Sequence, residues 1–313
     1  MGDASRIDAH AHQIPAHFLE EVRAATGTPY PLPEFTTEAH LAQMERHRIE
    51  LAVVSLPPPG VPSGAQAPRL ARLINEHYAR LVDAHPGRFA ALAALPLPDV
   101  DASLQELAYA LDDLRLDGVV LFSNADGVYA GDPRMDPLLE ELGRRGAYVL
   151  LHPSDPPEAP LGAYPPWLME YPFETTRAVV TLMYNGGLRR HAGIRWHLPH
   201  LGGTLPFLAD RLATLVLREP ELARESGDDP LAPLAGVFLD TAQSHNDAAL
   251  AATLRFTGAE HVVFGTDWPF AVLADGPDPQ PGLDVLGDER AAVDRDNALR
   301  MAPLIARRLG ATA

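Results

Sequence analysis

Short apolar runs alternate with longer segments of helical periodicity along the whole chain, and this alternation constrains the fold more than any other feature. The eight runs expected to be strands span residues 5–9, 51–56, 88–95, 117–122, 147–152, 193–198, 237–241 and 261–266. Strands that alternate with helices pair in parallel through crossover connections. Eight such units in a chain of 313 residues predict an α/β fold, a (β/α)8 TIM barrel, that forms a single domain over residues 1–313.

An open, doubly wound sheet is the alternative for the same order of elements. Such a sheet usually has a glycine-rich turn after its first strand, and no such turn follows residues 5–9. The helices are expected at residues 38–47, 68–84, 101–114, 135–145, 173–185, 205–217, 247–256 and 291–309. A proline-rich insertion, residues 153–172, is expected between the fifth strand and the next helix.

Composition narrows the chemistry that the barrel can perform. The chain has no cysteine, which excludes disulfides, thiolate metal sites and cysteine nucleophiles. Its formal charge of −17 argues against nucleic acid and anionic membrane surfaces as partners, because both attract basic proteins. No apolar run approaches the length of a membrane span, and no secretory signal is visible, so we expect a soluble cytoplasmic protein.

Ligand-type side chains gather at the ends of the expected strands, where the catalytic residues of a barrel lie. His10 and His12 are two residues apart in an extended segment and therefore face the same side. His152 ends the fifth strand, His200 follows the sixth, and Asp267 follows the eighth. Imidazole and carboxylate groups are suitable ligands for Zn²⁺, Mn²⁺ or Fe²⁺ where thiolates are absent. The set predicts a metal centre with a further histidine beside it as general acid or base.

Each of these residues also has a plainer explanation when taken alone. A pair such as His10 and His12 is a weak signal, His152 suits a buried core position, and His200 suits a helix cap. The coincidence of all of them at strand ends is what favours a metal site. His245, which follows the seventh strand, stays ambiguous, and the other histidines fall on helices or inside a strand.

Several motifs spread over nearly the whole chain resemble the amidohydrolase superfamily. They are IDAHAH (residues 7–12), GVVLFSN (118–124), VLLHPSDPP (149–157), the long block from PFETTR to ADR (172–211) and VVFGTDWPF (262–270). The block at 172–211 is the most specific and is similar to the amidohydrolase-related branch. That branch contains the aminocarboxymuconate-semialdehyde, γ-resorcylate, 5-carboxyvanillate and 6-methylsalicylate decarboxylases.

The resemblance implies one divalent metal ion, Zn²⁺ or Mn²⁺, held by His10, His12, His152 and Asp267. It assigns His200 to orienting or activating the water or substrate at the metal. Other branches bridge two metals with a carboxylated lysine, and this chain has no lysine at all, which excludes such a site. The related decarboxylases also imply a homodimer or homotetramer.

The leading hypothesis is a metal-dependent, non-oxidative decarboxylase, a carbon–carbon lyase, of a small hydroxylated aromatic or unsaturated carboxylate similar to salicylate. Asp267 or His200 would protonate the ring carbon beside the carboxylate. The alternative is a hydrolase of a lactone, ester or amide that uses a metal-bound hydroxide and the same residues. A protein that merely binds a small carboxylate is disfavoured, because it has no need of a spare histidine beside four ligands.

Substrate contacts are the least constrained part of the hypothesis. The segment at residues 121–133 resembles 6-methylsalicylate-decarboxylase-like members, so Ser123 and Asn124 are candidate contacts, although a turn or a cap explains them equally well. Trp268 follows the metal aspartate and is a candidate for stacking on a ring, against core packing as the plainer reading. Aromatic residues of the insertion, Tyr164, Trp167 and Phe173, are candidates for the wall of the pocket.

Overall fold

The structure is a computed structural model that describes residues 5–158, 162–215, 218–227 and 229–310. The predicted barrel is confirmed, and the open doubly wound sheet is wrong. Eight parallel strands follow one another around the sheet: β1 (Arg6–His12), β2 (Ile49–Ser55), β3 (Phe89–Ala93), β4 (Gly118–Phe122), β7 (Tyr148–His152), β8 (Arg195–Leu198), β9 (Phe238–Asp240) and β10 (Val262–Val263). A short antiparallel hairpin, β5 (Asn124–Ala125) and β6 (Val128–Tyr129), follows β4.

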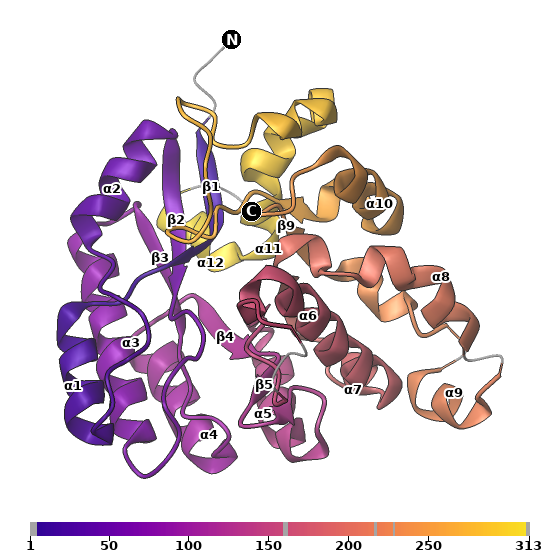
Figure 1. Ribbon diagram of the computed structural model, residues 1–313, viewed down its shortest axis with the longest axis horizontal. Coiled ribbons are helices and arrows are strands. Elements are labelled where there is room, and N and C mark those ends of the chain that lie inside the picture. The colour runs from indigo at the N-terminus through magenta and orange to yellow at the C-terminus, as the bar shows by residue number, and fades with distance from the viewer. Residues whose placement is uncertain (1–4, 159–161, 216–217, 228, 311–313) are drawn as a thin grey trace.

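Main-chain hydrogen bonds between the first strand and the segment after the last close the barrel. Ala9 N donates to Phe264 O at 2.9 Å, Asp267 N to His10 O at 2.8 Å, and His12 N to Trp268 O at 2.8 Å. In Figure 1 the indigo strand β1 accordingly lies beside the yellow C-terminal part of the chain. The two ends of the barrel sequence therefore meet at one seam.

The helices surround the strands on the outside. They are α1 (Ala16–Thr26), α2 (Thr37–Arg46), α3 (Ala67–Ala84), α4 (Val100–Ala108), α5 (Asp136–Arg145), α6 (Pro166–Tyr184), α7 (Gly187–Arg190), α8 (Leu205–Leu215), α9 (Pro220–Ser226), α10 (Asp247–Thr257), α11 (Asn297–Met301) and α12 (Pro303–Arg308). Polar caps begin several of them, since Thr36, Asp99 and Asn246 each accept a hydrogen bond from a main-chain N–H of the first turn. No helix of the described residues is both long and apolar enough to cross a membrane.

Several element boundaries differ from the sequence prediction, and three of them bear on the polar end of the barrel. Strand β1 extends to His12 instead of ending at residue 9, so both histidines lie within the strand. Strand β10 ends at Val263, because the chain beyond it turns and bonds to β1. Helix α6 begins at Pro166, so residues 166–172 of the expected insertion, about a third of it, are helical. Proline is well tolerated in a first turn, and Pro172 lies inside the helix. Residues 159–161 of the insertion and 216–217 of an expected helix lie outside the described residues.

Apolar side chains fill the barrel interior below the strand ends. Alternate residues of β1, β2 and β3, such as Ile7, Leu51 and Leu92, pack with Met301 and Ile305 from α11 and α12. The C-terminal helices thus close one end of the barrel, and the polar residues collect at the other. A second, larger apolar layer lies between the strands and the outer helices.

His40 on α2 is a buried histidine from which a pH dependence of stability follows. Its ring stacks on Trp268 at 4.2 Å, and burial together with the charges of His12 and Arg88 lowers its pKa to about 3. The unfolded chain takes up this proton near pH 6.5, so acidification from that pH favours unfolding. Compared with His40→Phe, metal-free parent protein should lose up to about 2–3 kcal/mol more unfolding free energy between pH 7 and pH 4.5. Urea titrations at both pH values measure this, and parallel losses would refute it.

Candidate metal centre

Four ligand-type side chains converge at the open end of the barrel. One nitrogen or oxygen atom from each of His10, His12, His152 and Asp267 lies within 4.8 Å of every other, and all four side chains are buried. The histidines come from β1 and the end of β7, and Asp267 comes from the loop that follows β10. Nε2 of His10 lies 3.2 Å from Nε2 of His12, which in turn lies 3.0 Å from Oδ1 of Asp267. The structure therefore brings together the four residues predicted as ligands.

Hydrogen bonds on the outer nitrogen of each histidine determine which nitrogen faces the centre. Nδ1 of His10 lies 2.8 Å from Oδ2 of Asp240, Nδ1 of His12 lies 3.3 Å from the Ser55 carbonyl oxygen, and Nδ1 of His152 lies 2.7 Å from the carbonyl oxygen of the next residue. A carbonyl or carboxylate oxygen only accepts, so each Nδ1 carries a proton, and Nε2 is the nitrogen of each ring that would present a lone pair to a cation. Nε2 of His152 is buried without a hydrogen-bond partner in the described chain. This arrangement of donors fits a divalent cation.

The electrostatics of the site are consistent with cation binding. Burial lowers the pKa of His12 and lowers that of His152 well below its ordinary value, so both rings are neutral. Burial also opposes the charged form of His10, but the carboxylates of Asp240 and Asp267 outweigh it and raise its pKa to about 9. The pKa of Asp267 lies well below its usual range, because its histidine neighbours outweigh the effect of burial. A cation entering this site competes with a proton on His10.

His200 stands beside the ligand set and faces the same space. It begins the short turn after β8, its Nε2 lies 3.4 Å from Oδ2 of Asp267, and its Nδ1 is buried without a partner in the described chain. Its φ of 57° is left-handed, as are those of Gln243 (52°) and Asp267 (57°). Three strand ends thus hold a strained residue at the cavity, as functional sites often do.

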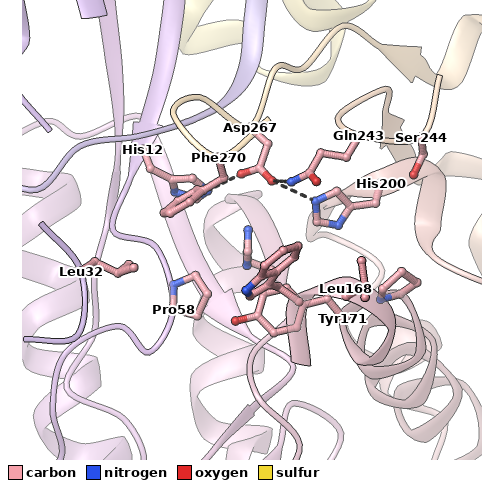
Figure 2. Close-up of a pocket in the computed structure, with 13 residues that line it drawn as sticks. His12, Leu32, Pro58, Leu168, Tyr171, His200, Gln243, Ser244, Asp267 and Phe270 are labelled. Atoms are coloured by element: carbon pink, nitrogen blue, oxygen red, sulfur yellow. Dashed lines mark hydrogen bonds and ion pairs between the residues drawn. The ribbon is translucent and has the colours of Figure 1, made fainter. Parts of the chain in front are cut away.

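A cavity of about 400 Å³ opens above these groups. Its lining residues are His12, Leu32, Pro58, His152, Trp167, Leu168, Tyr171, Pro172, His200, Gln243, Ser244, Asp267 and Phe270. In Figure 2 Asp267 extends between His12 on one side and Gln243 and His200 on the other, and the apolar and aromatic side chains form the facing walls. None of the lining residues is arginine or lysine, so an anionic ligand has no side-chain cation here to pair with.

Two predicted substrate contacts, Ser123 and Asn124, are not among the lining residues. Both are buried and use their polar atoms within the protein. Oγ of Ser123 lies 3.0 Å from Oγ of Ser154, and the Asn124 side-chain amide donates to Glu174 at 3.2 Å. The Ser123 contact joins the end of β4 to the segment that follows β7, and the Asn124 bond joins the β5–β6 hairpin to α6.

The aromatic candidates are divided between the cavity and its surroundings. Trp268 is not among the lining residues; it stacks on His40 and packs against the core. Trp167 lines the cavity, whereas Tyr164 and Phe173 do not. His245 does not line it either.

Sequence reasoning missed several lining residues and one buried carboxylate. Gln243 and Ser244 follow β9, and the Gln243 amide donates to Oδ2 of Asp267. Catalytic residues of a barrel lie after the ends of its strands, and this rule indicates the loop after β9. His245 is the one residue of that loop that the sequence singles out. Asp240 ends β9 and contacts His10. It is a charged residue at the end of an apolar strand, and this position marks it as a candidate in the same way. Tyr171 lines the cavity from α6, in the part of the helix that was expected to be a loop.

Comparison with known proteins gives matches over most of the chain. A model of the amidohydrolase family matches residues 7–304. A 6-methylsalicylic acid decarboxylase of Aspergillus aculeatus is 37% identical over 280 residues, covering 85% of this chain and 84% of that protein. A decarboxylase of Aspergillus niger is 35% identical over 322 residues, covering 95% of this chain and 87% of that protein.

A solved structure gives the same fold. The crystal structure of a dihydroxybenzoic acid decarboxylase from a Polaromonas species, with bound manganese and the inhibitor 2-nitroresorcinol, has a TM-score of 0.79 at 21% identity and covers 97% of each chain. At this identity the likeness bears on the fold alone. The two fungal relatives, in contrast, are similar in sequence over most of the barrel that carries the cavity.

Proposed function

This chain belongs to the amidohydrolase family, and we propose that it removes carbon dioxide, without oxidation, from a small hydroxylated aromatic acid of the salicylate type. As an enzyme it is a carboxy-lyase. The observation that carries the proposal is the cluster of four ligand atoms, all within 4.8 Å of one another, at the polar end of a cavity with aromatic walls. Curated relatives that are more than a third identical are named decarboxylases, and this favours decarboxylation over the hydrolysis that the same residues also allow.

We further propose that His10, His12, His152 and Asp267 hold one Mn²⁺ or Zn²⁺ ion. The unpartnered Nε2 of His152 in the described chain and the Nδ1 hydrogen bonds of His10 and His12 support this donor set. When bound, such an ion supplies the positive charge that a carboxylate and a neighbouring hydroxyl require, acting as a Lewis acid. Manganese, which is bound in the dihydroxybenzoic acid decarboxylase of the same fold, is therefore the first ion to test.

The chain's own residues handle the proton. Decarboxylation breaks the bond between the ring carbon and the carboxylate, and the ring carbon must receive a proton in its place. His200 and Asp267 both line the cavity, with Nε2 and Oδ2 at 3.4 Å, so either group is placed to hold this proton and to pass it to the ring carbon. Such a donor contributes about 10²–10⁴-fold to the rate. The proton is restored from solvent after carbon dioxide leaves, so the reaction consumes one proton.

The walls of the cavity suit an aromatic ring. Leu32, Trp167, Leu168, Tyr171 and Phe270 present apolar or aromatic surface opposite the polar end. A flat ring buried there loses contact with water and gains contact with these side chains. Because the lining residues include no arginine or lysine, a second anionic group on the ring has no partner in the cavity. We therefore expect acids with one carboxylate to be preferred over dicarboxylates.

Product analysis tests this proposal directly. Metal-free protein, reloaded with Mn²⁺ or Zn²⁺, is incubated with salicylate-type acids such as 6-methylsalicylate and 2,6-dihydroxybenzoate, and carbon dioxide release is measured. We expect release from at least one hydroxylated monocarboxylic acid, and none from metal-free protein. A matched panel of lactones and aryl esters is followed by acid release. Acid release without carbon dioxide release would favour hydrolysis, and equal carbon dioxide release with and without metal would refute the metal-dependent scheme.

A further inference from the structure

We propose that His197 and Tyr148, neither of which lines the cavity, are positioning residues for the metal centre, acting on His10 through Asp240. This inference rests on the metal site of the proposed function and extends it to residues deep in the barrel. His197 lies inside β8, and Tyr148 begins β7.

A continuous row of polar contacts connects the two residues to His10. Oη of Tyr148 lies 2.8 Å from Nδ1 of His197, and Nε2 of His197 lies 3.0 Å from Oδ2 of Asp240. The same Oδ2 lies 2.8 Å from Nδ1 of His10. All four side chains are buried, with exposures between 0 and 3%. The row thus runs from the metal centre down through the interior of the barrel.

The donor and acceptor chemistry gives this row one direction. The Asp240 carboxylate only accepts, so His10 donates to it through Nδ1. Nε2 of His197 faces the same oxygen at 3.0 Å without the alignment of a hydrogen bond, and the negative charge of that oxygen favours a proton on Nε2. With its proton on Nε2, the neutral His197 ring can only accept at Nδ1, and the Tyr148 hydroxyl is therefore the donor there. At the upper end, the bond from Nδ1 of His10 to Asp240 leaves Nε2 as the nitrogen that faces the metal centre.

The two oxygens of the Asp240 carboxylate have different partners, and His197 contacts the same oxygen as His10. Oδ1 accepts main-chain N–H groups of His200 and Ala242 at 2.9 and 3.0 Å, which hold that oxygen in position. Oδ2 has only the two histidine rings as partners among the described contacts. Without His197, His10 alone must satisfy this buried oxygen, and its ring is free to follow the carboxylate as that relaxes.

Packing alone is a weaker explanation for the row. The surrounding interior is apolar, with Ala9, Leu92, Leu150 and Val263 at comparable depth. Burying polar side chains there is unfavourable unless each group is paired, and apolar residues of similar volume fill such space without that requirement. A row of polar contacts that ends on a candidate metal ligand is what orientation of that ligand requires, because partners of ligating histidines set both tautomer and ring angle.

Metal affinity tests the proposal without reference to turnover. Full-length protein is freed of metal, and Mn²⁺ is titrated while free Mn²⁺ is followed by electron paramagnetic resonance. We expect His197→Leu to weaken Mn²⁺ binding by about 10–100-fold. His197→Gln should bind nearly as the parent does, because its amide N–H₂ can take the place of Nε2–H beside Asp240. Tyr148→Phe should show a smaller loss.

Tyr184→Phe is the matched control for Tyr148→Phe. It also removes one tyrosine hydroxyl, which donates to the Leu212 carbonyl oxygen at 2.7 Å, away from the metal centre. Parental affinity in a folded His197→Leu protein would overturn the proposal. If that variant does not fold, as judged by circular dichroism, equal affinities of Tyr148→Phe and Tyr184→Phe would overturn it. A parent protein that binds neither Mn²⁺ nor Zn²⁺ would instead refute the metal centre itself.

Discussion

Replacing Asp267 with asparagine is expected to abolish metal retention and carbon dioxide release together. Asp267 contacts His12 at 3.0 Å, His200 at 3.4 Å and the side-chain amide of Gln243. Its carboxylate therefore lies at the centre of the polar contacts in the cavity. Partners that only touch a metal ligand are worth about 10–100-fold in affinity, so loss of a ligand itself should cost at least about 100-fold. The proton-holding capacity of the carboxylate is lost as well, which adds to the fall in turnover.

Asparagine is the right substitution because the fold should tolerate it. It matches aspartate in shape, and asparagine accepts the left-handed φ of 57° at this position better than most residues. Metal content is measured by elemental analysis after dialysis, and activity by carbon dioxide release with excess Mn²⁺. Retention of one ion per chain by Asp267→Asn would contradict the assignment of Asp267 as a ligand.

The second large effect is expected at His200, and it should separate metal binding from turnover. It contacts Asp267 at 3.4 Å, and it lies outside the cluster of four that share a centre. His200→Ala should therefore keep about one ion per chain. Loss of the proton-holding imidazole should lower kcat about 10²–10⁴-fold, with a smaller change in KM.

His245→Ala is the control for this experiment. It removes a histidine from the neighbouring loop that does not line the cavity, and it should leave both metal content and kcat near those of the parent. A His200→Ala protein that loses its metal would make His200 a ligand. One that keeps full kcat would remove it from the proton transfer.

The barrel was predictable from the sequence because its signal is spread over eight repeats of the same pattern. Local errors do not change such a prediction: β10 is only two residues long, and the pattern still identified it. The start of α6 was missed because prolines in this stretch suggested a loop, whereas the first turn of a helix accommodates proline without losing a hydrogen bond.

The four ligand-type residues were predictable for a different reason. Each lies at or just after a strand, where the barrel geometry determines the direction of the side chain. Ser123 and Asn124 also follow a strand, but contacts with Ser154 and Glu174 decide where their side chains point, and those partners are 30 to 50 residues away in sequence. Contacts between residues so far apart in the sequence produce no local pattern from which the side-chain direction could be predicted.

His197, Asp240 and Tyr148, which lie below the metal centre, were not predictable from the sequence. His197 interrupts the apolar strand β8, and a lone histidine in such a strand has no distinguishing spacing. The role proposed for His197 depends on its contacts with Asp240 and Tyr148, and only the register of β7, β8 and β9 brings these residues beside it.

The seam of the barrel has a consequence for the order in which the molecule matures. His10 and His12 precede Asp267, the fourth member of the set, by about 250 residues. A nascent chain therefore cannot complete the site until the last strand has bonded to β1. An ion held by the proposed ligand set would connect β1 to the segment that follows β10. Chelators should accordingly lower the melting temperature of the whole barrel through mass action on the folded state.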